Sequence, residues 1–551
     1  MGFIKKFFFH VGSKKKKKQG KKKQEKLGIS KNVPKGTIEK SLAANIEVIK
    51  ETTGNSKDIK IRNIKIGEGD SHLTAAIIYT EGLVDELTVK DFLIESTLKD
   101  VRLQNVGNPK IAVQVLKEKI LPVGEVKELD CWEDLFTYLM DGQTIILING
   151  ITKGLMASTR GGEKRQISEP VTEISIRGPR ESFTETIRTN SALIRKRIRN
   201  PNLWLESMKI GKVTQTDVGI MYIKGIVNDK VVAEVKKRLN QINIDGILES
   251  GYIEQLIEDK TFTTFPTIFH TERPDVVAAN LLEGRVAILI DGSSNVLLAP
   301  AVFIQFFQAA DDYYGRFDLS SALRFLRVLI FFISLIAPAI YIAATTFHQE
   351  MIPTPLVIAL AAQRESVPFP AFVEAIIMEV TFEIMREAGV RLPRAIGQTV
   401  SIVGAIVLGQ AAVQAGFVSP AMLIVVSITG IANFATPSYA IAISARLIRF
   451  IIMVMAATFG FYGCLMGLMV MAIHLCSLRS FGVPYMTPLA PFIPGNFGDT
   501  VIRKPIWEFK ERPRLISQTN VIRAGEHQRP EPPGNQSNSE KKNEKGEKND
   551  S

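Results

Sequence analysis

The sequence feature that most constrains this fold is a hydrophobic block that extends from about residue 328 to residue 476. The block contains four long runs without a charged side chain, at residues 328–347, 395–417, 418–445 and 450–476. A helix needs about 20 apolar residues to cross roughly 30 Å of hydrocarbon. Each run reaches that length, and core helices of soluble proteins seldom contain so long an uncharged run. We therefore predict a polytopic membrane protein.

The rest of the 551-residue chain is polar and basic. The formal net charge is +12, and part of it lies in a lysine-rich head, with lysines at 14–18, 21–23 and 26. Such a head is either a solvated disordered arm or a segment that attracts anionic lipid headgroups, at about 1 kcal/mol per basic residue. Nucleic acid is a less favoured partner, because no aromatic platform or reading helix accompanies these lysines.

Signatures of catalysis, metal binding and export are missing from the sequence. Cys131, Cys464 and Cys476 lack the spacing of a disulfide framework or a metal site. The six histidines are scattered, and there is no P-loop, GxSxG, CxxC or Rossmann glycine pattern. We expect a protein that is not an enzyme, with no catalytic residue, cofactor or metal. Residues 1–9 are too short for a signal peptide, so the N-terminal half is expected on the cytoplasmic side.

The polar half contains an internal duplication. Three features recur in the same order at offsets of 142 to 144 residues: Lys-Ile-Gly at 65 and 209, a tyrosine at 79 and 222, and a turn glycine at 150 and 292. The turns Asn149-Gly150 and Asp291-Gly292 lie between apolar runs, a pattern typical of type I′ hairpins. We predict two homologous α/β subdomains, and we interpret residues 286–299 as a buried hairpin rather than a membrane span.

These patterns define an architecture of duplicated α/β subdomains followed by a helical transmembrane domain of four to five spans. The predicted parts are a disordered head (1–60), subdomain 1 (61–158), a basic connector (159–208), subdomain 2 (209–300), a linker (301–322), the transmembrane domain (323–476) with a re-entrant or amphipathic segment (351–392), a Pro-rich membrane-proximal segment (477–517) and a disordered tail (518–551).

The connector between the subdomains is rich in arginine. One interpretation is a surface connector whose arginines pair with local glutamates. The other is a coupling element that touches lipid headgroups or a neighbouring subunit, and its candidate residues are Arg177, Arg180, Arg195 and Arg197.

The stretch between the first two hydrophobic runs is the most informative about mechanism. A short apolar segment that contains Val357 precedes a helix predicted at 371–388, on which Glu379, Glu383 and Glu387 share one stripe. The helix could be interfacial, with its charges among headgroups. Alternatively, the segment lines a water-filled path, where rings of acidic side chains in an oligomer would favour cations. Water, nearby arginines or passing cations must offset the like charges.

Small residues in the hydrophobic runs predict close helix packing. Ser401, Ala405 and Gly409 are four residues apart, and Gly463 and Gly467 form a GxxxG pattern. Arginines before the first and fourth runs, at 324, 327, 446 and 449, favour a cytoplasmic location for both points. Arg391 and Arg394 favour the same side, which requires an odd number of crossings between 347 and 391. The side of the C-terminus stays open.

Five segments resemble the GerA family, the A subunits of spore germinant receptors in endospore-forming bacteria. They are GPRESFTETIRTNSALIRKRI (178–198), TERPD (271–275), DDYYGR (311–316), VPFPAFVEAIIMEVTFEIMREAGVRLP (367–393) and GQAAVQAG (409–416). The resemblance covers about residues 60–510; the lysine head and the polar tail lie outside it.

The resemblance implies a receptor subunit in the inner membrane of the spore. It would act with a transporter-like B subunit and a lipoprotein C subunit, respond to small nutrients, and oligomerise through the A subunit into a ligand-gated cation channel. Two alternatives stay open: a non-conducting scaffold or signal coupler, and a signal-amplifying channel similar to stage V sporulation protein AF. A secondary transporter is disfavoured, because the membrane block is short and shows no inverted repeat.

Overall fold

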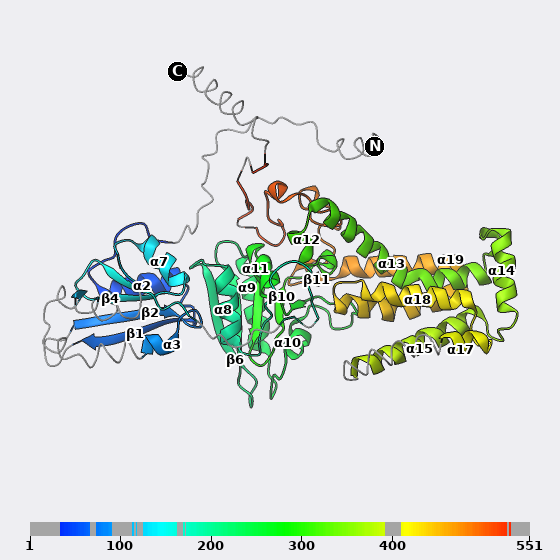
Figure 1. Cartoon of the computed structure of the whole chain (residues 1–551), viewed down its shortest axis with the longest axis horizontal. Coiled ribbons are helices and arrows are strands. Elements are labelled where there is room, and N and C mark those ends of the chain that lie inside the picture. The colour runs from blue at the N-terminus through cyan, green and yellow to red at the C-terminus, as the bar shows by residue number, and fades with distance from the viewer. Residues whose placement is uncertain are drawn as a thin grey trace, which may run out of the picture.

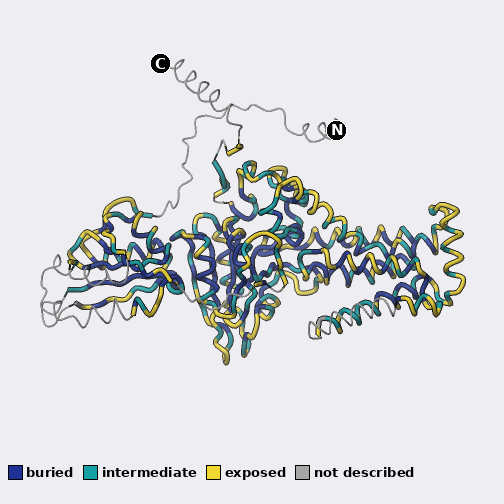
Figure 2. The backbone as a smooth tube through the Cα atoms, viewed as in Figure 1, coloured by how far each residue is buried: buried dark blue, intermediate teal, exposed yellow. Residues whose placement is uncertain are grey.

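A computed structural model describes residues 33–66, 73–90, 113–114, 117, 125–161, 169–170, 172–391, 409–518, 520–525 and 528–530. Two α/β subdomains lie side by side, and a long helical bundle extends from the second of them (Figure 1). In each subdomain the strands form the buried interior, and the bundle has a buried centre along its length (Figure 2).

Subdomain 1 is a five-stranded antiparallel sheet with the order β1-β2-β4-β5-β3. Its strands are β1 (Ile59–Ile66), β2 (Leu73–Thr80), β3 (Val126–Leu129), β4 (Thr144–Ile148) and β5 (Gly154–Ala157). One face carries α2 (Leu42–Thr52) and α7 (Trp132–Met140), and the short α3 (Glu86–Thr88) follows β2. Because Ile38 and Ile49 are buried in this core, the subdomain begins well before residue 60, within the predicted head.

Subdomain 2 repeats the arrangement, with strand order β6-β7-β9-β10-β8. Its strands are β6 (Leu203–Ile210), β7 (Thr216–Ile223), β8 (Phe269–Thr271), β9 (Val286–Ile290) and β10 (Val296–Ala299). Helices α8 (Ile187–Arg197) and α11 (Pro274–Leu282) pack on one face, and α9 (Asp229–Gln241) and α10 (Ser250–Ile257) on the other. The predicted connector (159–208) therefore contains α8 and most of β6, which belong to this subdomain. Residues 286–299 form the expected hairpin.

Both predicted hairpins exist, but neither is a type I′ turn. In each, five residues separate the strands, and of the Asn149-Gly150 and Asp291-Gly292 pairs only the glycine has a positive φ, 89° at Gly150 and 86° at Gly292. Asn149 and Asp291 instead use their side chains. Each accepts a hydrogen bond from the first amide of a helix, at 3.1 Å from Leu42 and 3.0 Å from Ile187. The loop is longer because it holds a helix N-terminus as well as reversing the chain.

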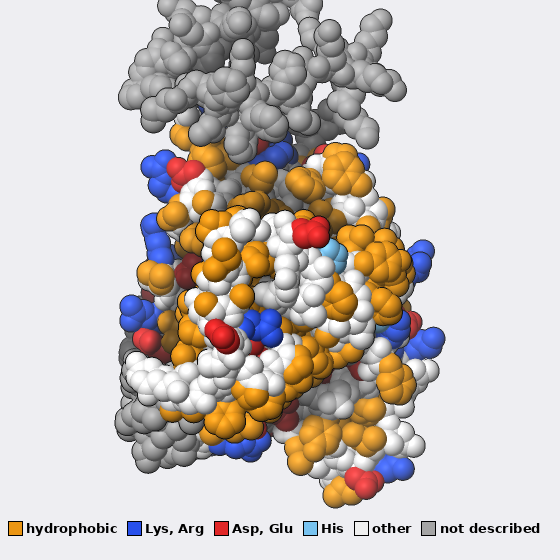
Figure 3. All heavy atoms as spheres, turned by 90° about the vertical axis from the view of Figure 1, so that its right-hand side faces the viewer, with side chains coloured by type: hydrophobic (Ala, Val, Ile, Leu, Met, Phe, Trp, Pro, Cys, Tyr) orange, Lys and Arg blue, Asp and Glu red, His pale blue; other side chains and the backbone are white. Residues whose placement is uncertain are grey.

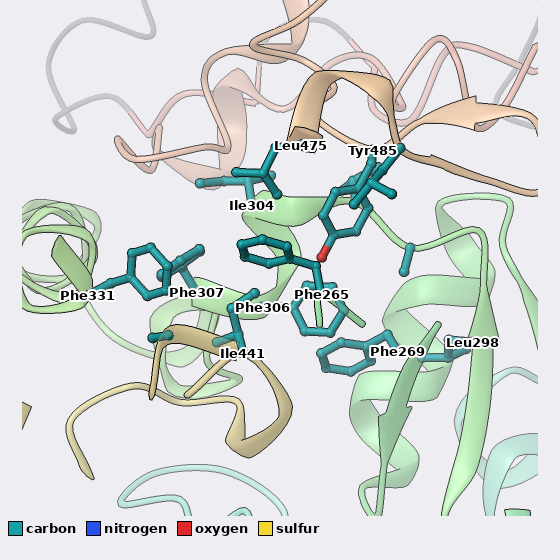
Figure 4. Close-up of a cluster of buried hydrophobic side chains, with 14 of the residues drawn as sticks. Phe265, Phe269, Leu298, Ile304, Phe306, Phe307, Phe331, Ile441, Leu475 and Tyr485 are labelled. Atoms are coloured by element: carbon teal, nitrogen blue, oxygen red, sulfur yellow. The ribbon is translucent and has the colours of Figure 1, made fainter. Parts of the chain in front are cut away.

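An aromatic joint connects subdomain 2 to the bundle. The 3-10 helix η3 (Phe303–Phe307) presents Phe306 and Phe307 to a cluster that includes Phe331 from the bundle and Tyr485 from the C-terminal segment (Figure 4). The Phe303 amide donates to the Tyr485 carbonyl at 2.8 Å. The C-terminal segment contains β11 (Arg479–Ser480), β12 (Val483–Pro484), η6 (Pro494–Asn496) and η7 (Ile506–Glu508). It lies against subdomain 2, on the same side of the bundle as the N-terminal half.

The bundle follows the short α12 (Asp311–Tyr314). Its elements are α13 (Phe317–Thr346), η4 (Gln349–Met351), α14 (Thr354–Arg364), α15 (Ala371–Arg391), α17 (Gly409–Gln414), α18 (Pro420–Phe434) and α19 (Tyr439–Ser477). Within the described residues, α13 and α19 are long and apolar enough to cross a membrane, whereas α18 is shorter. The uncharged run at 418–445 is interrupted between α18 and α19 by residues 435–438. Residues 392–408, most of the run at 395–417, lie outside the described part.

Helix α19 is two helices that fold back on each other at Gly460. The Gly460 backbone is non-helical (φ 62°, ψ −140°), and a Cβ on Gly463 would collide with the Met455 backbone. Ser444 and His474, near opposite ends of α19, bond to the neighbouring residues Thr264 and Thr263 of subdomain 2. A straight helix of 39 residues would separate its ends by about 58 Å. Each arm therefore spans roughly half of that length.

The outer surface of the bundle is apolar. Large side chains such as Phe325, Ile451 and Val470 are between 59% and 61% exposed. Viewed from the α14 end, hydrophobic side chains cover much of the bundle, and most charged side chains lie around its periphery (Figure 3). Exposed apolar area of this extent is typical of a surface that faces lipid.

Candidate functional site

Helix α15 runs along the length of the bundle and carries the predicted acidic stripe. It starts at the far end, defined as the end away from the subdomains where α14 lies, and returns toward them (Figure 1). Glu374 near its start contacts Ser419 just before α18, whereas Glu383 contacts Arg446 in the first part of α19. Between residues 347 and 391 the chain returns once toward the subdomains, and the odd number of membrane crossings there stays a prediction.

Glu379 lies in the centre of the bundle, paired with Arg449 of α19. The side chains of both residues are 1% exposed, and Arg449 Nη1 lies 2.5 Å from Glu379 Oε2. Arg449 also donates to the Ser334 carbonyl of α13 at 2.6 Å and to Asn433 Oδ1 of α18 at 3.1 Å. One guanidinium therefore joins four helices. Removing one partner of such a buried pair typically costs about 3–5 kcal/mol, because the other charge stays buried.

The next two glutamates are progressively more exposed. Glu383 is bonded by Arg386 of its own helix and lies 3.3 Å from Arg446 Nη1. Glu387 is 61% exposed and pairs with Arg391 at 2.7 Å. Among the described residues, Glu379 Oε1 and Glu383 Oε1 are buried without a hydrogen-bond partner. The stripe is thus neutralised by arginines, and each of its two inner carboxylates keeps one unbonded oxygen.

A fourth carboxylate on α15, which the predicted stripe did not include, lies at the far end. Glu374 is completely buried, and its Oε1 accepts bonds from both the amide (2.6 Å) and the hydroxyl of Ser419, the N-cap of α18. Its other oxygen lies 3.8 Å from Arg364 Nε of α14. Glu374 is five residues before Glu379, so the i, i+4, i+8 pattern did not include it. Together with Glu374, α15 carries acidic side chains at four successive levels, that is, at four positions along about 20 Å of its axis.

The remaining pathway and packing candidates are separated in the structure. Val357 is half-buried on α14, a helix with no buried residue that lies across the far end of the bundle (Figure 1). Gly463 and Gly467 pack against the first arm of α19, with a Cβ at Gly467 3.2 Å from Ile452. A Cβ at Gly409 would lie 3.4 Å from the Leu423 side chain of α18. The other two packing candidates, Ser401 and Ala405, lie outside the described residues.

The connector arginines have different environments. Arg195 is buried and forms a bidentate pair with Asp58 of subdomain 1. Arg197 bonds Glu181 at 2.7 Å, and the exposed Arg180 lies 3.4 Å from Glu169. The backbone amide of Arg177 donates a hydrogen bond to Asp311 at 3.3 Å. Arg195 therefore joins the two subdomains through a buried pair, whereas Arg180 and Arg197 pair locally. Two further connector arginines, Arg188 and Arg199, also reach subdomain 1, at Glu81 (3.1 Å) and Asp141 (2.5 Å).

No group of three or more potential metal ligands occurs among the residues that the structure describes. The site is instead a line of carboxylates and arginines inside an apolar bundle attached to two α/β subdomains. Such an arrangement defines a membrane protein whose helical domain carries compensated charges along one helix.

Comparisons with known proteins assign the family. A family model described as Bacillus/Clostridium GerA spore germination protein matches residues 47–515. Spore germination protein KA of Bacillus subtilis (strain 168) is 58% identical over 512 residues, 93% of each chain. The uncharacterized membrane protein YfkQ of the same organism is 42% identical over 493 residues, 90% of this chain and 94% of its own.

A solved structure is also similar. The N-terminal domain of the A subunit of the Bacillus megaterium spore germinant receptor GerK3 is 49% identical and covers 50% of this chain and 100% of its own, with a TM-score of 0.40. The chain described here belongs to the GerA family of spore germination proteins, and it is a membrane protein and not an enzyme.

Proposed function

We propose that this chain is the A subunit of a nutrient-responsive germinant receptor in the spore inner membrane, and that copies of it form a gated cation path. In this proposal it acts with a transporter-like B subunit, which binds the nutrient, and a lipoprotein C subunit. The N-terminal half faces the cytoplasm, and anionic lipids attract the lysine head. Helices α13, α15, α18 and both arms of α19 cross the membrane, five passes among the described residues.

The observation that carries the proposal is the set of four acidic levels on α15, each with an arginine beside it. Ionisable residues are expensive inside a membrane and usually mark ion or proton pathways. In the closed state the arginines neutralise the carboxylates. A shift of α15 relative to α19 would separate Glu379 from Arg449 and Glu383 from Arg446. Glu379 would then be free, Glu383 would keep only Arg386 of its own helix, and the uncompensated negative charge would favour cations along the path.

The test is monovalent-cation release from spores that carry Glu383→Gln. We expect release after nutrient addition to slow at least about tenfold, or its preference among cations to change, with an unchanged amount of protein in the membrane. Glu350→Gln, an exposed far-end glutamate outside the stripe, is the matched control and should release ions normally. Glu379→Gln should act similarly; if it lowers the protein level, the double change with Arg449→Met removes the uncompensated charge.

A second function is favoured by the complete pairing of the stripe within one chain. A scaffold or signal coupler needs such pairs only to hold its helices together. Normal cation release by both glutamate variants, with normal protein levels, would reject the channel and support the scaffold. A channel similar to stage V sporulation protein AF would conduct without nutrient receptor partners, and the likeness to spore germination protein KA supports the receptor subunit instead.

A further inference from the structure

A cavity of about 600 Å³ lies where subdomain 2, the bundle and the C-terminal segment meet. Its walls come from the segment before α8, from α11 and η3, from α12, from the turn between α18 and α19, and from the C-terminal segment. Cavities of about 300–1,000 Å³ at the junction of structural units are the usual size and place for small-molecule sites. The acidic stripe of α15 contributes no residue to this cavity.

More acidic than basic side chains line the cavity. Four carboxyl groups line it and only two guanidinium groups: Glu173, Asp275, Glu283 and Asp311 against Arg273 and Arg523. Arg273 pairs with Asp275, at 3.1 and 2.8 Å, and Glu283 lies 3.5 Å from Arg285 and 3.8 Å from Arg523. Among the described residues, Glu173 and Asp311 are the two lining carboxyl groups without an ion pair. The excess of carboxyl groups disfavours an anionic ligand and favours a cationic one.

Two polar atoms on the wall lack a partner among the described residues. Gln305 is 4% exposed, and its amide nitrogen donates to Asn280 at 3.1 Å while its Oε1 accepts nothing. The hydroxyl of Ser175 is also buried and unbonded. A buried acceptor without a donor costs about 1–3 kcal/mol, so a ligand that donates hydrogen bonds here recovers that cost.

The remaining wall is aromatic. Phe306 and Tyr314 line one side together with Phe269, and Phe434 and Phe509 come from the bundle and the C-terminal segment. Aromatic faces suit the apolar body of a ligand and attract a cation that lies over them. Acceptors beside aromatic walls recognise a positively charged donor with an apolar group.

From these contacts we propose that the cavity binds a small organic ammonium compound with an apolar group. The ammonium donates to Gln305 Oε1 and the Ser175 hydroxyl near the Glu173 carboxyl, and the apolar group lies against the aromatic wall. The walls belong to three separate parts of the chain, so a bound ligand would hold subdomain 2, the α18–α19 turn and the C-terminal segment in one arrangement.

Burial raises the pKa of Glu173 to about 7. The hydroxyl of Thr271 and the guanidinium of Arg273 act in the opposite direction, because they stabilise the charged carboxylate, and the negative charge of Glu272 raises the pKa further. A cation prefers the ionised carboxylate. Binding should therefore strengthen as the pH rises from 6 to 8, and Glu173→Gln should reduce this dependence. Glu283, whose pKa burial also raises, lines the same cavity and accounts for any dependence that remains.

The experiment compares three probes of similar shape on the purified full chain in detergent: benzylamine as its ammonium ion, benzyl alcohol and benzoate. Isothermal titration should give a dissociation constant for benzylammonium at least about tenfold below that of benzyl alcohol, with no saturable binding of benzoate. Ser175→Ala and Glu173→Gln should each weaken benzylammonium about fivefold or more. Glu169→Gln, an exposed glutamate on the same segment, is the control and should bind normally.

Equal binding of the three probes, absence of saturable binding, or normal binding by both variants would overturn the proposal. Ser175→Ala removes only an unbonded hydroxyl, so it tests the site even if Glu173→Gln folds poorly. The titration needs no ion flux, and its failure is therefore distinguishable from failure of the proposed channel.

Discussion

The two subdomains have the same strand order and the same helix caps, but they are attached to the rest of the molecule by different kinds of contact. The α8–α11 face of subdomain 2 continues into the aromatic joint and the bundle as one apolar core. The corresponding α2–α7 face of subdomain 1 forms a separate core, which is filled by residues of that subdomain such as Trp132 and Phe136. One copy of the repeat has become part of the membrane domain, and the other remains a separate unit.

Subdomain 1 is attached mainly through polar contacts, among them the partly exposed ion pairs of Arg188 with Glu81 and of Arg199 with Asp141. Arg195 of α8 reaches across to Asp58, which is 4% exposed, and the Trp204 ring covers Gly54 and donates to the Thr52 carbonyl at 3.2 Å. Apolar packing distributes stability over many side chains, whereas a buried ion pair concentrates it in two. Single substitutions should therefore release subdomain 1 more readily than they separate subdomain 2 from the bundle.

The largest effect is expected from Arg195→Met. The change leaves the Asp58 carboxylate buried without its cation, which should weaken the contact between subdomains by about 3–5 kcal/mol. Trp204 reports this contact directly, because the chain has three tryptophans and the other two can be replaced by phenylalanine. In that background the Trp204 emission should shift to the red at a lower urea concentration.

The double variant Arg195→Met with Asp58→Leu is the control for this first prediction. It removes both charges and should recover most of the lost stability, since apolar pairs often replace buried ion pairs at little cost. An unchanged Trp204 transition in the single variant would mean that the ion pair does not hold the subdomains together.

A smaller effect is expected from Gly54→Ala. Gly54 has a φ of 62°, and a Cβ there would overlap the Trp204 ring. Backbone strain and overlap together should cost about 2–3 kcal/mol and shift the same Trp204 transition. The matched control is Gly225→Ala, where φ is 88° but no heavy atom lies within 4 Å of the new Cβ, so only about 1 kcal/mol is expected. Equal losses at both glycines would show that Trp204 does not pack closely on this turn.

The smallest effects test whether the two copies are equivalent. Asn45 bonds the amide and carbonyl of Glu39 at 3.0 and 2.7 Å, and Asn190 makes the same bonds to Thr184 at 2.8 and 2.6 Å. Replacing either by alanine should lower the free energy of unfolding by about 1–2 kcal/mol, measured by urea titration. Asn240→Ala, at an exposed position of α9, should change it by less than about 0.5 kcal/mol. A large loss at one asparagine alone would contradict the equivalence.

Local patterns predicted those parts of the fold that depend on neighbouring residues. Alternating apolar runs and turn glycines predicted the hairpins at Gly150 and Gly292, and proline followed by an apolar repeat predicted the start of α15 at residue 371. The full extent of the repeat was missed, although Asn45 and Asn190 are a sequence signal for it. They lie 145 residues apart, near the offset of the other repeated features.

Long-range contacts explain the differences in the bundle. By position in the sequence Arg446 and Arg449 indicate the cytoplasmic side, which stays a prediction; in the structure both are buried and pair with the acidic stripe. The sequence places them 63 and 70 residues from their partners, so no spacing rule connects them. The reversal of α19 depends on a single residue, Gly460, inside an apolar run that reads as one continuous helix.

The sequence by itself determined the class of protein: apolar runs long enough for a membrane, a duplicated α/β half, and a helix with an acidic stripe. These properties depend on the periodicity and length of nearby residues, which the sequence states directly. Only the tertiary structure decided which arginine neutralises which glutamate, which copy of the repeat joins the bundle, and where the cavity lies. Each of these depends on contacts between residues far apart in the chain, and many arrangements of such contacts are compatible with the same local pattern.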